Sequence, residues 1–287
     1  MVIRLGREMA TNMDIKDSLI ECKDNQKAWV IGDIHGCFNQ FMEVIQSPQI
    51  AQDDIVILVG DIIDRGPDSV KMLNWAMDNV NCGGKYLMIR GNHEQNIIED
   101  LKSVVEQCER KNKHRVYEGE EPMDYKDLPI FDLRCRYDFC EYMEREGLFN
   151  IGQVEKYIRW MEKLPFCFRV SLSNKKKFLI AHAWFEGELR PDGSVRQIIS
   201  DTDIVWYRDC DFYHNLADSD YHPMEEGEIL VHGHTPVPII RGHYGEPASP
   251  IFREHSINID GGCFLSKGYG GRLIALCLDD SRTIYSN

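Results

Sequence analysis

The sequence of 287 residues predicts an α/β protein whose core is a β-α-β-α-β unit. Three short apolar runs, at 28–31, 55–59 and 86–89, have the length and composition of buried strands. Apolar residues recur at helical spacing after each run. Alternating strands and helices favour parallel strands joined by helical crossovers, and continuous apolar runs indicate a sheet covered on both faces.

Several predicted elements end or begin at a recognisable signal. The first two runs stop at Gly32 and Gly60, and Pro67 lies near the start of the second predicted helix. The apolar faces of the three helices are Phe38, Phe41, Met42 and Ile45; Val70, Leu73 and Met77; and Ile97, Ile98, Leu101, Val104 and Val105.

The rest of the chain indicates one domain with a variable insertion. We interpret residues 1–25 as an N-terminal arm and 26–287 as a single domain. A charged, partly helical and exposed insertion is expected at about 106–150, followed by a helix over 153–164 that Pro165 ends. A second, mixed sheet is predicted from the strand-like runs at 166–170, 178–180, 229–231, 256–259 and 273–278.

Composition excludes several classes of protein. No apolar run is long enough to span a bilayer, so no membrane association is expected. The ten cysteines show no CxxC pair, and together with the lack of a recognisable secretion signal this favours reduced thiols and a cytoplasmic location. A net charge of −14 disfavours stable nucleic-acid binding. An anionic substrate would therefore need a local positive site.

Polar clusters follow the three predicted strands of the core. The segments are GDIHG at 32–36, GDIIDRG at 60–66 and RGNHE at 90–94. Asp33 and His35 are two residues apart in an extended segment, so their side chains point the same way and can meet one metal ion. Asp61 offers two oxygens that can bridge a pair of ions, and Asn92 offers an amide oxygen. Ligand sites of open α/β sheets form at these strand ends.

Histidine recurs at the ends of later strands. His182 follows the run at 178–180, and His232 and His234 follow the run at 229–231. Taken singly, each polar residue has a simpler explanation, such as a helix cap, a turn or a hydrogen-bonded core histidine. Helix capping does not call for histidine, however, and the simple explanations together account poorly for the whole set.

In this order, the three motifs, the isolated His182 and GHTP at 233–236 resemble the PPP-type metallophosphoesterases. The similarity is greatest to the phage lambda and bacterial serine/threonine protein phosphatases, and it extends from about Trp29 to about Leu278. The first three motifs with their spacing are its specific part. The resemblance implies a calcineurin-like α/β/β/α sandwich with a metal-binding core.

The same resemblance implies a site with two divalent cations. The ligands of the first ion would be Asp33, His35 and Asp61. The ligands of the second would be Asp61, Asn92, His182 and His234. Such carboxylate, imidazole and amide donors suit Mn²⁺, with iron or zinc as alternatives. Two ions about 3.5–4 Å apart hold a phosphoryl group and activate a water molecule for in-line attack.

Catalytic and phosphate-binding roles follow from the resemblance as well. His93 would protonate the leaving group and Asp64 would orient its ring. The phosphate-binding residues would be Arg65, Arg208 and Asn92. Arg208 is assigned from the segment VWYR at 205–208, and a surface arginine paired with Asp209 is the alternative.

Two nearby residues are expected to play supporting roles. His232 lies where relatives usually have an apolar residue, so we interpret it as a core histidine or one outside the ligand set. Asp260 lies in the segment NIDGG at 258–262, which resembles a closing strand of bacterial members. We expect Asp260 to support the site from behind without a catalytic role.

The sequence favours a serine/threonine-type protein phosphatase with a phosphoprotein or phosphorylated small molecule as substrate. The alternative is a symmetrical dinucleoside-tetraphosphate hydrolase of the diadenosine tetraphosphatase type. That relative typically has alanine and aspartate at the places of Asp64 and Glu94, so both residues favour the phosphatase. A binding module that lost catalysis is a third possibility, disfavoured because every ligand and the proton donor are present.

Overall fold

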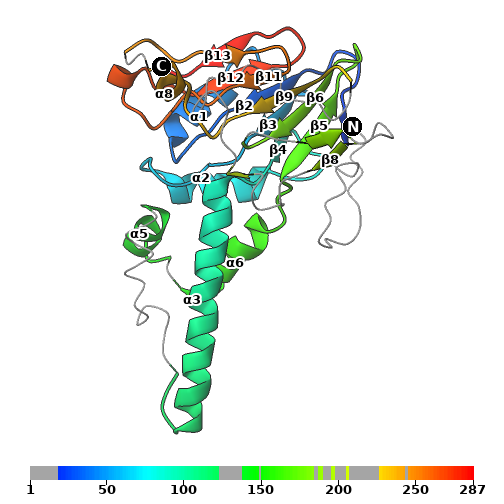
Figure 1. Cartoon of the computed structure of the whole chain (residues 1–287). Helices are drawn as coiled ribbons and strands as arrows, with labels where there is room; N and C mark the ends of the chain where they lie inside the picture. Colours follow the sequence, from blue (N-terminus) through cyan, green and yellow to red (C-terminus); the bar gives the residue numbers. More distant parts are fainter. Residues whose placement is uncertain are drawn as a thin grey trace.

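The computed structural model describes residues 19–122, 138–148, 150–183, 187–189, 195–197, 205–206, 226–242 and 245–287. Two mixed sheets pack against each other, and helices cover the free face of one of them (Figure 1). This arrangement confirms the predicted α/β class with a second, mixed sheet. No helix in the described part of the chain has the length and apolar character needed to span a bilayer.

The five-stranded sheet carries the predicted β-α-β-α-β unit. Its strands, in spatial order, are β13 (Thr283–Tyr285), β12 (Ile274–Cys277), β2 (Ala28–Ile31), β3 (Ile55–Leu58) and β4 (Tyr86–Met88). β2, β3 and β4 are parallel, as predicted, whereas β12 runs antiparallel to β2 and β13 antiparallel to β12. The crossovers are α1 (Phe38–Ile45) and α2 (Ser69–Asn79), and α3 (Asn92–Tyr117) follows β4.

The six-stranded sheet closes the core from the other side. Its order is β1 (Leu19–Glu21), β5 (Cys167–Ser171), β6 (Lys177–Ala181), β9 (Glu228–His232), β11 (Ser256–Asn258) and β10 (Ile251–Phe252). The pairs β1–β5, β6–β9 and β9–β11 are parallel, and the other two pairs are antiparallel. The last residues of the predicted N-terminal arm thus form the edge strand β1. A separate hairpin consists of β7 (Gly187–Leu189) and β8 (Val195–Gln197).

Strand alternation divides the buried side chains between two cores. Trp29 and Ile31 of β2 face the helices, whereas Ala28 and Val30 face the six-stranded sheet. Both faces of the central strands are therefore apolar, as their sequences predict.

The strand predicted at 273–278 was expected in the second sheet, and this expectation is wrong. β12 instead pairs with β2, with Leu276 opposite Val30. Ile274 and Leu276 point into the core between the sheets, while Ala275 and Cys277 join the core under the helices. A strand that is apolar on both faces fits either sheet, so its side-chain pattern does not identify its neighbours.

The predicted insertion consists partly of helix. α3 continues through Tyr117, and its distal half extends away from the two sheets (Figure 1). α5 (Asp138–Arg145) and α6 (Ile151–Met161) follow, and α6 packs against α3. α6 begins after Asn150, whose side-chain oxygen accepts a hydrogen bond from the Gln153 N–H at 3.1 Å. Among the described residues, the remaining elements are α8 (Val237–Arg241) and the 3-10 helix η5 (Lys267–Tyr269).

Candidate metal centre

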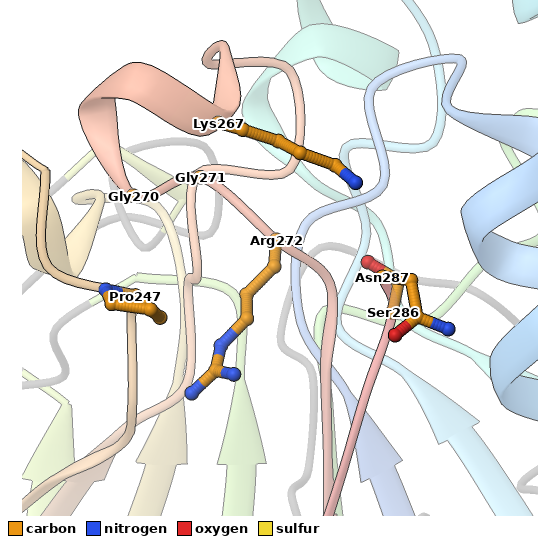
Figure 2. Close-up of a pocket in the computed structure, with 7 residues that line it drawn as sticks. All are labelled: Pro247, Lys267, Gly270, Gly271, Arg272, Ser286 and Asn287. Atoms are coloured by element: carbon orange, nitrogen blue, oxygen red, sulfur yellow. The ribbon is translucent and has the colours of Figure 1, made fainter.

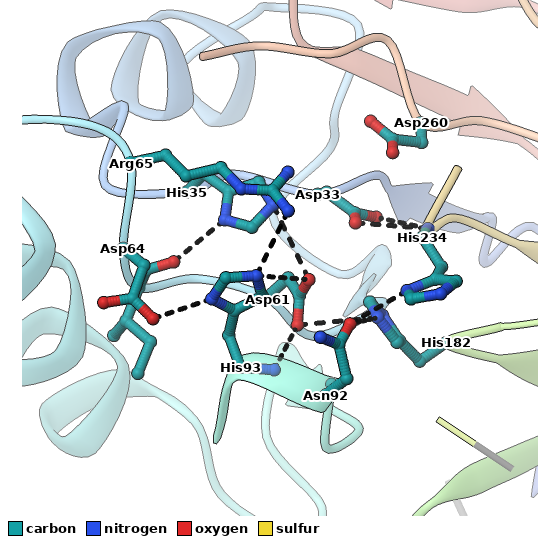
Figure 3. Close-up of polar contacts among 12 residues, drawn as sticks. Asp33, His35, Asp61, Asp64, Arg65, Asn92, His93, His182, His234 and Asp260 are labelled. Atoms are coloured by element: carbon teal, nitrogen blue, oxygen red, sulfur yellow. Dashed lines mark hydrogen bonds and ion pairs between the residues drawn. The ribbon is translucent and has the colours of Figure 1, made fainter. Parts of the chain in front are cut away.

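The polar residues predicted as metal ligands lie together at one edge of the two-sheet core (Figure 3). Asp33 and His35 follow β2, and Asp61 follows β3, so parallel strands bring them to the same edge. Further donors come from the first residue of α3 and from the segments after β6 and β9. The six side chains from these segments are Asp33, His35, Asp61, Asn92, His182 and His234, and all of them are buried.

Several of these residues adopt a backbone conformation that side chains rarely take. His35, Asp61 and His234 have φ angles of 46°, 48° and 68°, in the left-handed region. Such positions cost about 1–3 kcal/mol each and occur where the surrounding structure enforces them, often at functional sites. Glycine is required beside them: a β-carbon at Gly233 would overlap Oδ1 of Asp33, and one at Gly91 would overlap Oδ1 of Asp61.

The first cluster consists of His35, Asp61 and His93. Nε2 of His35 lies 3.6 Å from Oδ2 of Asp61, and Nε2 of His93 lies 3.9 Å from the same oxygen. Nδ1 of His35 contacts the carbonyl oxygen of Ile63 at 2.9 Å and therefore carries a proton, and burial lowers the pKa of this histidine, which favours the neutral ring. Nε2 of His35 is then a buried acceptor without a hydrogen-bond partner, as expected of a metal-binding nitrogen.

The second cluster gathers imidazole rings around the amide of Asn92. Oδ1 of Asn92 lies 2.9 Å from Nε2 of His182 and 2.8 Å from Nδ1 of His234. Nε2 of His182 is also 3.5 Å from Oδ1 of Asp61, while its Nδ1 contacts the Val59 carbonyl oxygen at 2.8 Å. A carbonyl partner on the far nitrogen is the usual way to orient a metal-binding histidine.

Buried carboxylates give the site a negative potential. Burial raises the pKa of Asp33 well above its ordinary value, and the neighbouring charges of Asp260 and Asp61 raise it further. Burial also opposes ionisation of Asp61, but the surrounding His182, His93 and His35 outweigh it and lower the pKa of that carboxyl. Carboxylates crowded in a buried space need compensating positive charge. The donor set and this charge therefore fit divalent cations.

A histidine–aspartate pair lies beside the clusters. Nδ1 of His93 is 2.7 Å from Oδ2 of Asp64, and the His93 N–H donates to Oδ1 of Asp61 at 2.9 Å. Nη2 of Arg65 lies 3.2 Å from Nε2 of His93, and the guanidinium stacks 4.4 Å above the Phe264 ring. The Arg65 side chain is otherwise exposed. The arginine thus borders the clusters on the solvent side.

Glu94 is a residue of the site that the sequence did not single out for a role. Its carboxylate is fully buried and accepts hydrogen bonds from the backbone N–H groups of Asp61 at 2.8 Å, Ile62 at 2.9 Å and Gly91 at 2.9 Å. Burial raises the pKa of Glu94 to about 7, with a further contribution from Asp61. The side chain fastens the loop after β3 to the start of α3. A glutamate in the first helical turn, as in a capping box, was the available signal.

The other predicted residues have different outcomes. His232 is buried at the end of β9, with Nδ1 3.2 Å from the Gly233 carbonyl oxygen. Asp260 is buried near Asp33, and its Oδ1 accepts a hydrogen bond from the Gly262 N–H at 2.8 Å. Arg208 lies outside the described residues, and its assignment stays a prediction.

A separate pocket of about 260 Å³ contains none of the predicted site residues (Figure 2). Pro247, Gly270 and Gly271 form part of its wall, and Lys267 and Arg272 contribute positive charge. The Arg272 guanidinium stacks 3.5 Å from the centre of the Tyr285 ring. The clustered donors, rather than this pocket, mark the candidate site.

A buried donor set at the strand ends of two packed sheets, next to a His–Asp pair, is the arrangement of a metal-dependent phosphoesterase. A family model described as calcineurin-like phosphoesterase matches residues 27–261. This chain therefore belongs to that family and is a hydrolase of the metallophosphoesterase type. The family implies divalent metal ions, which the observed donors fit.

Comparison with individual proteins finds two kinds of relative. Serine/threonine-protein phosphatase 1 of Salmonella typhimurium is 40% identical over 81 residues, which cover 28% of this chain and 35% of that protein. A symmetrical bis(5′-nucleosyl)-tetraphosphatase of Buchnera aphidicola is 30% identical over 54% of this chain and 42% of its own length. The asymmetrical bis(5′-nucleosyl)-tetraphosphatase PrpE of Anoxybacillus flavithermus is 26% identical over 89% of this chain and 91% of its own length.

Solved structures share the fold at low sequence identity. A protein serine/threonine phosphatase from Saccharomyces cerevisiae superposes with a TM-score of 0.53 at 13% identity, covering 95% of this chain and 84% of that one. A cold-active protein-tyrosine phosphatase from Shewanella gives a TM-score of 0.53 at 14% identity, covering 99% of this chain and 90% of that one. The calcineurin-like two-sheet fold is thereby confirmed.

Proposed function

We propose that this metallophosphoesterase is a serine/threonine-type protein phosphatase. The observation that carries the proposal is the 2.7 Å contact between Nδ1 of His93 and Oδ2 of Asp64, beside the buried donor clusters. A phosphoserine or phosphothreonine ester releases an alkoxide, which is a strongly basic leaving group. Its departure requires a proton donor, and an aspartate-oriented histidine is suited to that task.

The donor clusters support a site for two ions. In our proposal Asp33, His35 and Asp61 hold the first ion, and Asp61 is shared with the second. The remaining ligands of the second ion are Asn92, His182 and His234. When bound, the ions supply charge stabilisation for the phosphoryl group and a water of lowered pKa. We propose Mn²⁺, with iron or zinc as alternatives, because the donors combine carboxylate, imidazole and amide groups.

The remaining residues act on the substrate. Nη2 of Arg65 lies 3.2 Å from Nε2 of His93, so a phosphate next to that nitrogen meets the guanidinium as well. Arg65 neutralises phosphate oxygens with a bidentate fork, and Asn92 and Arg208 are assigned to the same phosphate. His93 gives its Nε2 proton to the departing oxygen while Asp64 keeps the ring oriented.

A dinucleoside tetraphosphatase is the second candidate. The relatives from Buchnera aphidicola and Anoxybacillus flavithermus carry that activity in their names and match longer parts of this chain than the Salmonella protein does. Hydrolysis of a polyphosphate releases a nucleotide, which is a weakly basic leaving group and depends less on a proton donor. The His93–Asp64 pair therefore favours the phosphomonoesterase, whose leaving group needs it.

Reduced thiols support a cytoplasmic location for this activity. Cys22, Cys82 and Cys277, in the described part of the chain, are free thiols. Proteins that pass through oxidising compartments usually pair such residues. We therefore propose phosphorylated cytoplasmic proteins as the substrate class.

A side-by-side assay tests the proposal. The purified chain is incubated with a phosphoserine peptide, diadenosine tetraphosphate, a cyclic nucleotide and p-nitrophenyl phosphate, before and after chelation. We expect the highest kcat/KM on the peptide, loss of all activity on chelation and recovery with Mn²⁺. A higher kcat/KM on the tetraphosphate would replace the phosphatase with the second candidate, and undiminished activity after chelation would contradict the metal mechanism.

A further inference from the structure

Helix α5, which comes from the charged insertion, is docked onto the body of the protein. It lies against α2, and its Phe139 and Met143 side chains are fully buried. The Phe139 ring packs edge-on against the Tyr157 ring of α6, with centroids 5.8 Å apart. These contacts make the start of α5 a fixed point rather than a free surface helix.

The first two residues of α5 contact the loop that carries Asp64 and Arg65. The Phe139 N–H donates to Oδ1 of Asp64 at 2.9 Å. In the other direction, the Arg65 N–H donates to Oδ2 of Asp138 at 3.1 Å. The helix start thus contacts both residues, one by its backbone and one by a side chain.

This loop is a place where outside support matters. Asp64 and Arg65 have φ angles of 65° and 67°, so two successive residues that are not glycine adopt the left-handed conformation. Such a backbone persists only where its surroundings over-determine it. Asp138 fixes the backbone amide of Arg65. The position of this amide determines where the arginine side chain leaves the backbone.

We propose that Asp138 is a positioning residue for phosphate binding: by holding the backbone of Arg65, it directs the guanidinium toward the phosphate. The inference rests on the proposed function, in which Arg65 grips the substrate. The insertion thereby acquires a role, because its Asp138 supports an arginine that lies 73 residues earlier in the sequence. Asp138 acts through Arg65 and does not contact the substrate itself.

The competing explanation is that Asp138 only places a negative charge at the start of α5. Acidic side chains in the first helical turn are stabilising because they interact favourably with the helix dipole. Glu141 is the other acidic residue in the first turn of α5 and serves as the matched control. Among the described contacts, no hydrogen bond or ion pair joins Glu141 to the loop of Asp64 and Arg65.

The test compares Asp138→Ala, Asp138→Asn, Asp138→Glu and Glu141→Ala in the full chain with Mn²⁺. Circular dichroism and metal content check the fold, and kcat and KM are measured on a phosphoserine peptide. We expect Asp138→Ala to lower kcat/KM about tenfold, mainly through KM, as for loss of one hydrogen bond to a charged group. Asp138→Asn should retain most activity because its amide oxygen accepts the same N–H. Glu141→Ala should match the wild type.

Asp138→Glu distinguishes acceptor position from charge, even if Asp138→Ala does not fold. Glutamate keeps the charge but moves the carboxylate by one methylene. Greater activity in Asp138→Asn than in Asp138→Glu supports positioning, whereas the reverse order overturns it in favour of helix charge.

A double-mutant cycle with Arg65→Ala separates this inference from the proposed function. If Asp138 acts through Arg65, adding Asp138→Ala to Arg65→Ala lowers kcat/KM no further. An equal loss in both backgrounds would overturn the inference alone, as would a neutral Asp138→Ala beside an impaired Arg65→Ala. Wild-type kcat/KM in Arg65→Ala would overturn the proposed role of Arg65, and the inference with it.

Discussion

Two contacts hold His93 in place, one at its backbone N–H and one at its ring nitrogen Nδ1. Its N–H donates to Oδ1 of Asp61 at 2.9 Å, and its Nδ1 contacts Oδ2 of Asp64 at 2.7 Å. Burial alone would lower the pKa of His93, but the charges of Asp61 and Asp64 outweigh it and raise the pKa above the ordinary value. The raised pKa favours the protonated form of the ring, which a general acid requires.

Replacing this proton donor should separate chemistry from metal binding. We expect His93→Asn to lower kcat on a phosphoserine peptide by about 10²–10⁴-fold, the usual contribution of a general acid. The loss should be much smaller on p-nitrophenyl phosphate, whose leaving group is weakly basic. Metal content, measured by mass spectrometry of the purified variant, should be unchanged. Loss of both ions would show that His93 is a ligand instead.

The Glu94 carboxylate supports the candidate site by accepting hydrogen bonds from backbone N–H groups. Substitution of Glu94 should therefore lower the stability of the protein and weaken metal binding. A glutamine amide cannot accept hydrogen bonds from Asp61, Ile62 and Gly91 together, since its NH₂ faces one N–H donor. We expect Glu94→Gln to destabilise the protein by about 1–3 kcal/mol, the cost of an unsatisfied buried group, and to weaken Mn²⁺ binding. Urea unfolding and metal titration measure both effects. Glu106→Gln, at an exposed position on the same helix, should leave them unchanged.

Among the elements, the strand-to-loop junctions have the least room for change. The segments after β2 and β9 approach each other so closely that the His234 N–H reaches both oxygens of Asp33, at 3.2 and 3.1 Å. Only glycine at 233 leaves space for this carboxylate. Because the loops touch directly, a small added group changes the donor geometry.

Gly233→Ala should therefore displace Asp33. We expect weaker Mn²⁺ binding and at least about a tenfold lower kcat/KM, because misplacement of about 1 Å at a catalytic site costs up to about 10²-fold. Gly152→Ala makes the same chemical change on α6, where the nearest atom to the new carbon is 3.7 Å away. That control should be as active as the wild type and slightly more stable. Equal activity in both variants would show that the contact is unimportant.

The elements also show how far the sequence determines the fold. Apolar runs identify β2, β3 and β4 because both of their faces are buried. The same property leaves the neighbour of β12 undetermined, since pairing with β2 depends on contacts distant in sequence. The distal half of α3 lacks an apolar stripe but consists largely of good helix formers such as Glu, Lys and Arg, which explains the helix that periodicity does not reveal.

The sequence predicted which residues gather at the candidate site, but it did not predict the hydrogen bonds that hold these residues in place. The order of the motifs identified Asp33, Asp61 and Asn92 as candidate ligands. The parallel strands that precede them explain why these residues lie close together. The hydrogen bonds from the Asp61 N–H to Glu94 and from the Arg65 N–H to Asp138 join segments 33 and 73 residues apart, and no local pattern encodes them. Such contacts depend on packing, which only the folded chain defines.

At the scale of the whole molecule, the donor clusters connect both sheets. Asp33 and Asp61 extend from the five-stranded sheet, while His182 and His234 extend from the six-stranded sheet. In our proposal, cations bound between them join the two halves of the core and offset the repulsion of buried carboxylates. The net charge of −14 adds to that repulsion in the metal-free protein.

Metal removal should consequently destabilise the entire domain. We expect chelation to lower the unfolding free energy by about 2.7 kcal/mol when Mn²⁺ had been present at about 100 times its Kd, and re-addition to restore it. Calorimetric scans with and without Mn²⁺ measure the change. Asp61→Asn removes the shared carboxylate, so its melting temperature should respond far less to Mn²⁺. An equal response in both proteins would locate the stabilising ions elsewhere.

The contact between Asp33 and the backbone of His234 spans 201 residues, which has a consequence for biosynthesis. At about 5–20 residues per second, the ribosome needs about 10–40 s to advance from one to the other. During that interval the nascent chain exposes the early carboxylates without their late histidine partners, and strand β12 is still to be translated. Cation capture would therefore follow the emergence of the C-terminal strands, as a closing step of maturation.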